Sequence, residues 1–256
     1  MLRFLKAVRV LFWWAMFTSI ASMLVFVAVL RHNTIPAWDE IAADTNISQQ
    51  LSGKAASAVA KSRQSAVMVR SVGLNIFVGV STMSGTYFTA KDKNYVITVE
   101  HGIQGPCWLV TVVHDNKLYS CREMIAVDKG NDYAIFEVEQ IDNIRPLNIP
   151  KDLPKGTQWK RSYSLLNKII YTGYPNVVGP LTLRGDVVGY TQYEQIYVFS
   201  HAYGGASGSG VFSDDGKYIG YVVAVDVGQT ELGLDVLENI VIVNPSFNVD
   251  WRIVLD

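Results

Sequence analysis

The chain has 256 residues, of which 49% are hydrophobic and 18% are charged, with 22 Lys and Arg against 23 Asp and Glu. This length predicts one packed domain of roughly 200 residues with an additional segment. Three basic residues and no acidic ones precede residue 31, so the remainder has four more acidic than basic side chains. That balance argues against a nucleic-acid partner, because such partners require a basic patch.

The first hydrophobic segment, residues 11–30, contains twenty residues without a charge. A helix of that length spans about 30 Å, the thickness of a bilayer core. We therefore expect a short N-terminus at 1–10 and an uncleaved transmembrane anchor at 11–30. A cleaved signal peptide and a buried helix are the alternatives. A signal peptide has a shorter apolar region and ends in a small-x-small site, which Val27–Arg31 does not offer.

The charges flanking this segment predict its orientation. Basic residues come before it, and acidic residues follow it at Asp39, Glu40 and Asp44. This distribution places the N-terminus in the cytoplasm and the rest of the chain outside it, in the periplasm or the extracellular space.

Residues 31–63 are expected to form a tether. The stretch around Pro36 is irregular, and Ile47–Ser62 has the apolar spacing of a short amphipathic helix. The remaining residues, 64–256, form the predicted folded domain.

From residue 65 onward the chain consists of short runs rich in β-branched and aromatic residues, separated by turns about every ten residues. Such spacing predicts an all-β sandwich or a pair of barrels. A short closing helix is expected at 251–256. The expected strands lie at 66–69, 74–78, 85–89, 95–98, 108–113, 134–138, 169–172, 185–190, 196–199, 210–212, 218–225 and 240–243.

Two cysteines, Cys107 and Cys121, bracket a predicted hairpin with a turn at His114–Lys117. A disulfide between them suits an oxidising compartment. Two separate buried thiols are the alternative, because a bridge across the strands of one hairpin is geometrically awkward.

The segment Gly205–Gly210, with the sequence GASGSG, is the strongest candidate for chemistry. Small residues around Ser207 let a substrate approach and let backbone N–H groups converge on one point, as an oxyanion hole requires. A flexible turn is the ordinary interpretation of such a string. The four histidines are His32, His101, His114 and His201.

The order of these residues limits the possible catalytic triads. No histidine follows Ser207, which excludes the Ser…Asp…His order of α/β-hydrolases. The order His…Asp…Ser is filled by His101, Asp132 and Ser207. The order Asp…His…Ser would need Asp39, Asp44 or Asp92 as its acid. It is disfavoured because none of these lies at a strand end beside a glycine.

Six segments resemble, in the same order, the chymotrypsin-like serine proteases, and are most similar to the bacterial HtrA-like group. The spacings of 31 residues from His101 to Asp132 and 75 from Asp132 to Ser207 also fit that family. The resemblance covers residues 65–245. The segments are SGTYF at 84–88, VITVEH at 96–101, DYAI at 132–135, YTGYP at 171–175, GDVV at 185–188 and GASGSG at 205–210.

The resemblance implies two six-stranded antiparallel β-barrels and a serine endopeptidase that forms an acyl-enzyme. His101 would be the general base and Asp132 its orienting partner, with Asp128 as the nearest rival acid. The N–H groups of Gly205 and Ser207 would form the oxyanion hole. The substrate would be a protein or peptide. No cofactor or metal site is expected, and the oligomeric state stays open.

Other positions are weaker candidates. His201 lies where the family has the base of its primary specificity pocket, and a structural role at the rim is the alternative for this residue. Tyr221 and Asp226 would line another wall of that pocket. Glu100 beside His101, Ala206 beside Ser207 and the lack of a PDZ module depart from the family pattern. A catalytically silent protease-fold binding module at the membrane is the alternative function, and an unrelated β-barrel is a further one.

Overall fold

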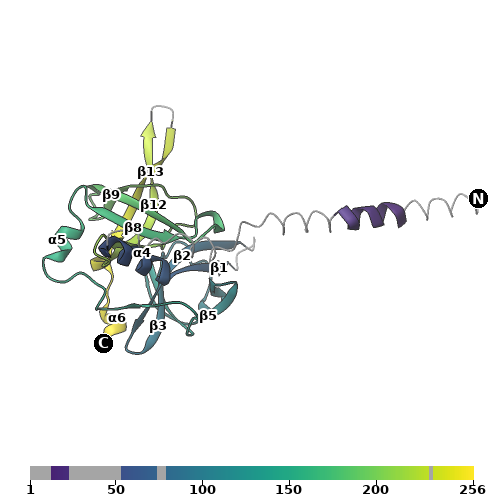
Figure 1. Ribbon diagram of the computed structural model, residues 1–256, viewed down its shortest axis with the longest axis horizontal. Coiled ribbons are helices and arrows are strands. Elements are labelled where there is room, and N and C mark those ends of the chain that lie inside the picture. The colour runs from purple at the N-terminus through teal and green to yellow at the C-terminus, as the bar shows by residue number, and fades with distance from the viewer. Residues whose placement is uncertain (1–12, 23–52, 74–78, 231–232) are drawn as a thin grey trace, which may run out of the picture. The chain divides into compact units, whose positions relative to one another are not determined.

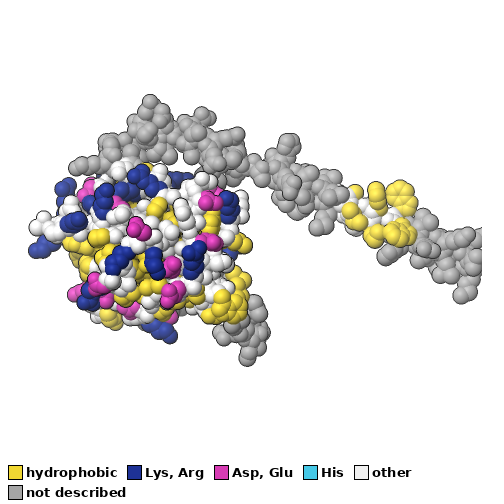
Figure 2. All heavy atoms as spheres, turned by 90° about the horizontal axis from the view of Figure 1, so that it is seen from below, with side chains coloured by type: hydrophobic (Ala, Val, Ile, Leu, Met, Phe, Trp, Pro, Cys, Tyr) yellow, Lys and Arg dark blue, Asp and Glu magenta, His cyan; other side chains and the backbone are white. Residues whose placement is uncertain are grey.

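The computed structural model describes residues 13–22, 53–73, 79–230 and 233–256, with backbone alone at 53–56, 225–230 and 233–238 (Figure 1). Of the predicted anchor at 11–30, residues 13–22 are described and are helical, with mainly hydrophobic side chains (Figure 2). No helix within the described ranges is long and apolar enough to cross a membrane. The rest of the predicted anchor lies outside them.

The first barrel is built from the N-terminal half of the folded domain. Its strands follow the order β1-β4-β5-β6-β3-β2, and β2 pairs with β1 to close the ring. All six pairings are antiparallel, and the short β7 adds to β2 in parallel. The strands are β1 Ala66–Val72, β2 Val80–Ala90, β3 Lys93–Thr98, β4 Val110–His114, β5 Lys117–Asp128, β6 Tyr133–Val138 and β7 Leu147–Asn148.

The second barrel closes in the order β10-β13-β12-β11-β8-β9. Its two longest strands, β12 and β13, extend beyond the other strands as a hairpin (Figure 1). The two predicted six-stranded barrels are thus confirmed. The strands are β8 Lys168–Gly173, β9 Leu181–Tyr190, β10 Ile196–Phe199, β11 Gly210–Ser213, β12 Tyr218–Thr230 and β13 Gly233–Pro245. The short helices are α5 Gln158–Ser162 and α6 Arg252–Leu255.

Each barrel has its own apolar core, because alternate side chains of a strand point to the same face. The second barrel is filled by small aliphatic residues such as Val187, Val211 and Val243. The larger first core includes Phe212, Tyr218 and Tyr221 from the second barrel. The two barrels therefore share a packed interface rather than meeting only at a linker.

The helix expected in the tether is part of the barrel domain. Helix α4 spans Gly53–Ser65, and the compact unit that contains both barrels begins at Leu51. Ala58 is fully buried, Lys61 pairs with Asp152 at 2.7 Å, and the Ser62 hydroxyl donates to Thr172 Oγ1 at 2.7 Å. These contacts attach the helix to the strands on which it lies.

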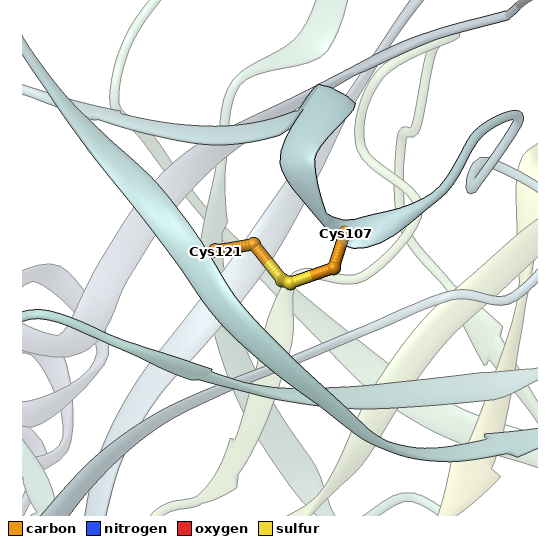
Figure 3. The surroundings of a disulfide bond; sticks show 2 residues. All are labelled: Cys107 and Cys121. Carbon is orange, nitrogen blue, oxygen red and sulfur yellow. A yellow bond between two sulfur atoms is a disulfide. The ribbon is translucent and has the colours of Figure 1, made fainter.

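Cys107 and Cys121 form a disulfide, with their Cα atoms 5.4 Å apart (Figure 3). Cys107 lies in a single 3₁₀ turn, Cys107–Leu109, that precedes β4, whereas Cys121 lies within β5. The β4–β5 ladder begins at Thr111. Because Cys107 is outside the ladder, the bond avoids the strained geometry of a bridge between paired strands.

Candidate active site

His101 and Asp132 meet at one end of the first barrel. His101 lies three residues after β3, and Asp132 directly precedes β6, which pairs antiparallel with β3 through Thr98 and Ala134. The Asp132 carboxylate contacts the histidine twice. Its Oδ1 accepts a hydrogen bond from the His101 backbone N–H at 2.9 Å, and its Oδ2 lies 2.7 Å from His101 Nδ1.

This pairing changes the acid–base properties of the imidazole. The hydrogen bond to Asp132 raises the pKa of His101 above 6.5, and the charges of Asp132 and Glu100 act in the same direction against the effect of partial burial. The His101 side chain is 53% exposed, so its ring is open to an incoming molecule. With Nδ1 held by the carboxylate, Nε2 is the nitrogen left to exchange a proton.

The loop that carries Ser207 is joined to the first barrel by Ser84 of β2. The Ser84 backbone N–H donates to the Ser207 carbonyl at 2.8 Å, and the Ser84 hydroxyl donates to the Gly205 carbonyl at 2.7 Å. Thr98 Oγ1 donates to the Ser84 carbonyl at 2.6 Å. The serine loop is therefore held against the end of the strand that leads to His101.

Gly208 shows how close this approach is. A Cβ atom at this position would lie 2.0 Å from the Ser84 carbonyl oxygen and 2.6 Å from Thr98 Oγ1, and its φ of +87° also favours glycine. Ser207 itself is partly exposed. Among the residues that the structure describes, no hydrogen bond joins the Ser207 hydroxyl to the His101 ring.

The backbone around Gly205 and Ser207 has a defined orientation. The Gly204 carbonyl accepts from Asn176 N at 2.7 Å, and the Ala206 carbonyl accepts from Ser209 N at 3.0 Å. In a trans peptide the N–H points opposite to the carbonyl. The Gly205 N–H therefore points away from the side on which Asn176 binds, and the Ser207 N–H points away from the side on which Ser209 binds. Within the described part of the chain, neither N–H donates to a backbone carbonyl.

Asp128, the rival acid, stabilises the turn before β6. Its carboxylate accepts from the N–H groups of Asn131 and Gly130 and from the Asn131 side chain, at 2.8–3.0 Å. The hydrogen bonds from Asn131 lower the pKa of Asp128 below its ordinary value. Its contacts are with the turn, and Asp132 is the carboxylate that reaches His101.

The predicted pocket residues have different positions. His201 is exposed and lines a cavity of about 270 Å³ with Arg184, Asp186 and Phe199. The expectation for Tyr221 is wrong, because its side chain is fully buried in the first core and its hydroxyl donates to the Asn131 carbonyl at 2.6 Å. The side chain of Asp226 lies outside the described residues.

Two residues of this region were not identified from the sequence. Ser84 is the first residue of the SGTYF segment at 84–88, but its two-sided contact with the serine loop depends on the packing of the barrels. Asn244 is a fully buried amide at the end of an apolar strand, and that contrast in polarity was the available signal. The described residues contain no group of three or more potential metal ligands of the His, Cys, Asp and Glu types.

Two closed antiparallel barrels, with a histidine–aspartate pair at one barrel and a glycine-flanked serine loop on the other, define the chymotrypsin-like class of folds. A family model described as a trypsin-like peptidase domain matches residues 83–220, more than half of the chain. The chain therefore belongs to the trypsin-like peptidase domain family.

Solved structures share this fold at low sequence identity. A serine endoprotease from Yersinia pestis has 18% identity and a TM-score of 0.59, covering 80% of this chain and 68% of that one. A protease from M. tuberculosis in its active form has 17% identity and a TM-score of 0.58, covering 77% and 83%. The HtrA-type protease AlgW with a tripeptide has 15% identity and a TM-score of 0.55, covering 77% and 61%. No curated protein matches the chain.

Proposed function

We propose that this chain is a serine endopeptidase with a triad of His101, Asp132 and Ser207. The observation that carries the proposal is the two-point contact between the Asp132 carboxylate and His101, at 2.7 and 2.9 Å. A carboxylate that binds both the ring and the backbone of a histidine fixes its tautomer and its orientation. The family and the HtrA-type fold support the hydrolase class.

The proposed reaction follows from the positions of these groups. Ser207 Oγ attacks the carbonyl carbon of a peptide bond, and its proton passes to His101 Nε2. Asp132 stabilises the resulting imidazolium. The N–H groups of Gly205 and Ser207 donate to the oxyanion, an interaction whose loss costs about 3 kcal/mol in the barrier. His101 then returns the proton to the leaving amine as the C–N bond breaks, and a water molecule activated by the same imidazole hydrolyses the acyl-enzyme.

The proposal includes a membrane anchor at residues 11–30, with the peptidase domain outside the cytoplasm. Twenty uncharged residues flanked by basic residues on the N-terminal side support it. The Cys107–Cys121 disulfide is in keeping with an oxidising compartment. Substrates would then be exported or membrane-proximal proteins. Alkaline phosphatase fused after Gln50 in a bacterial host should be active, whereas activity of a cytoplasmic reporter fused there would reverse the topology.

The catalytic proposal is tested with a peptide library and the full-length protein in detergent. Ser207→Ala should abolish cleavage, while Ser209→Ala should retain it, because the buried Ser209 hydroxyl is directed to the Ala206 carbonyl. The matched pair controls for changes in the loop itself. Cleavage by the Ser207→Ala protein at the wild-type rate would refute the assignment. A wild-type protein that binds peptides without cleaving them would favour the silent binding module.

A further inference from the structure

Asp132 adopts an unusual backbone conformation for a residue that is not glycine. Its φ is +50°, in the left-handed region. Asp128 caps the turn from one side, through hydrogen bonds with Gly130 and Asn131, none of which reaches the peptide that leads from Asn131 into Asp132. A conformation of this kind persists when surrounding contacts impose it. The contacts on that peptide therefore determine where the carboxylate points.

Two residues of the second barrel hold this peptide. The Asn131 carbonyl accepts a hydrogen bond from the Tyr221 hydroxyl at 2.6 Å and another from Asn244 Nδ2 at 2.5 Å. Tyr221 and Asn244 are opposite each other in the β12–β13 ladder. Asn244 Nδ2 also donates to the Tyr221 hydroxyl at 2.9 Å, and Asn248 Nδ2 donates to Asn244 Oδ1 at 2.7 Å, which fixes the orientation of the amide.

Tyr221 also lies next to the serine loop. Its backbone pairs with Gly210 of β11, and the following residue, Val222, exchanges backbone hydrogen bonds of 2.7 and 2.9 Å with Gly208 and Ser209. One residue thus contacts the turn of Asp132 through its side chain and the strand after Ser207 through its backbone. Burial raises the pKa of the Tyr221 phenol, and the Asp132 charge adds to this, so the hydroxyl stays a donor at working pH.

We infer that Tyr221 and Asn244 are positioning residues, which hold the Asn131 carbonyl from the second barrel and thereby keep the Asp132 carboxylate on His101. A planar peptide whose oxygen is fixed also fixes the direction of the next residue's N–Cα bond. From there, the left-handed conformation carries the carboxylate to both donors of His101. This inference rests on the proposed triad. According to this inference, Tyr221 and Asn244 hold the backbone that positions Asp132, and Asp128 holds only the preceding part of the same turn.

A purely structural role is the competing explanation, because both side chains are almost fully buried between the barrels. The two explanations differ in kinetics. Tyr221→Phe removes only the hydroxyl and leaves the ring in the core. If the pair positions Asp132, kcat falls between about tenfold and 10²-fold, the loss that a misplacement of roughly 1 Å causes. KM changes little, and the apparent pKa of His101 in the pH profile of kcat/KM falls towards 6.5.

The deciding experiment is a double-mutant cycle in the full-length protein, with Tyr221→Phe in the wild-type and Asp132→Asn backgrounds. Because Tyr221 acts through Asp132, its substitution should cost far less once the carboxylate is gone. Equal losses in both backgrounds, or no loss in the wild-type background, would overturn the inference. Tyr218→Phe is the matched control, because Tyr218 is a buried tyrosine of β12 whose hydroxyl has no hydrogen bond to the described residues around Asp132.

Asn244→Leu repeats the test if Tyr221→Phe does not fold, since it removes the second donor to the same carbonyl. Thermal unfolding of each variant separates misfolding from misplacement: a variant with a lowered Tm but unchanged kcat and pH profile contradicts the positioning role. Failure of the proposed function is a different result. In that case the wild-type protein itself shows no hydrolysis that depends on Ser207.

Discussion

Ser84→Ala tests how the two barrels cooperate. The Ser84 side chain is completely buried, and its oxygen accepts from the Tyr174 N–H at 2.8 Å while its proton goes to the Gly205 carbonyl at 2.7 Å. The Ser84 hydroxyl is thus the hydrogen-bond partner of both the Tyr174 N–H and the Gly205 carbonyl. Alanine therefore leaves the buried Tyr174 N–H and the part-buried Gly205 carbonyl without partners, and it also releases Gly205, whose N–H is one of the two proposed oxyanion donors.

The expected size of the effect follows from these contacts. An unsatisfied buried group costs about 1–3 kcal/mol, and the part-buried Gly205 carbonyl should cost about 1 kcal/mol, the low end of that range. The free energy of unfolding should therefore fall by about 2–4 kcal/mol. For a domain of about 200 residues this is a fall in Tm of about 4–16 °C. If the Gly205 N–H also loses its orientation, kcat should decrease by about 10²-fold, as when an oxyanion donor is removed.

The assay is thermal unfolding and peptide cleavage of Ser84→Ala beside Ser71→Ala. Ser71 is also a completely buried serine, and its hydroxyl accepts one backbone hydrogen bond, from Gln104 at 2.8 Å, away from the serine loop. Ser71→Ala should lower Tm by a smaller amount and leave kcat within about twofold. A Ser84→Ala protein with a lowered Tm and wild-type kcat would refute the link between Ser84 and the oxyanion donors.

Three further predictions concern pH, the disulfide and the tether. Because the pKa of His101 is raised, kcat/KM should reach half its maximum above pH 6.5, where the neutral base forms, and Asp132→Asn should shift that midpoint down. The same pairing stabilises the fold fully below pH 6.5, and the contribution is lost as pH rises through the folded pKa, as unfolding against pH would show. Replacing Cys107 and Cys121 by serine opens a loop of about 15 residues, which should cost about 3 kcal/mol and lower Tm by about 6–12 °C; an unchanged Tm would contradict this. A chain starting at Leu51 should retain the full-length kcat/KM on a peptide, and a tenfold rise, about 1.4 kcal/mol, would mean that the preceding residues inhibit the site.

The sequence predicted the class of fold and the histidine and aspartate that contact each other. The spacing of apolar runs predicted an all-β sandwich or a pair of barrels, and the family resemblance selected the two barrels. The absence of a histidine after Ser207 excluded the α/β-hydrolase order. The histidine and the aspartate meet because β3 and β6 are neighbours in the barrel. Sequence order supplies both residues, whereas the pairing of strands brings them within 2.7 Å.

Tyr221 shows why the rest could not be predicted. Its position after Ser207 places it on the correct strand, but the face that it presents depends on bulges. The β11–β12 register shifts between Val211 and Phe212, and the β12–β13 register shifts between Val222 and Ala224. Each shift reverses the alternation of side chains, so counting along the strand cannot distinguish pocket from core.

The docking of α4 was also beyond the sequence. Alanine-rich residues at helical spacing predict a helix but not a partner for its apolar face. That partner is the surface formed by strands more than a hundred residues later, where Ser62 meets Thr172 and Arg63 Nη1 lies 2.9 Å from Thr182 Oγ1. A truncation within this helix would therefore remove part of the domain, which is why Leu51 is the better starting point.

The central claim is that Ser207 is a nucleophile activated by His101. The most direct measurement is labelling of the full-length protein with a fluorophosphonate, because only an activated serine reacts, followed by mass spectrometry of its peptides. The account predicts one label per chain, located on Ser207, lost in Ser207→Ala and strongly reduced in His101→Ala. No label on the folded wild-type protein, or a label on Ser209 that persists in Ser207→Ala, would contradict it.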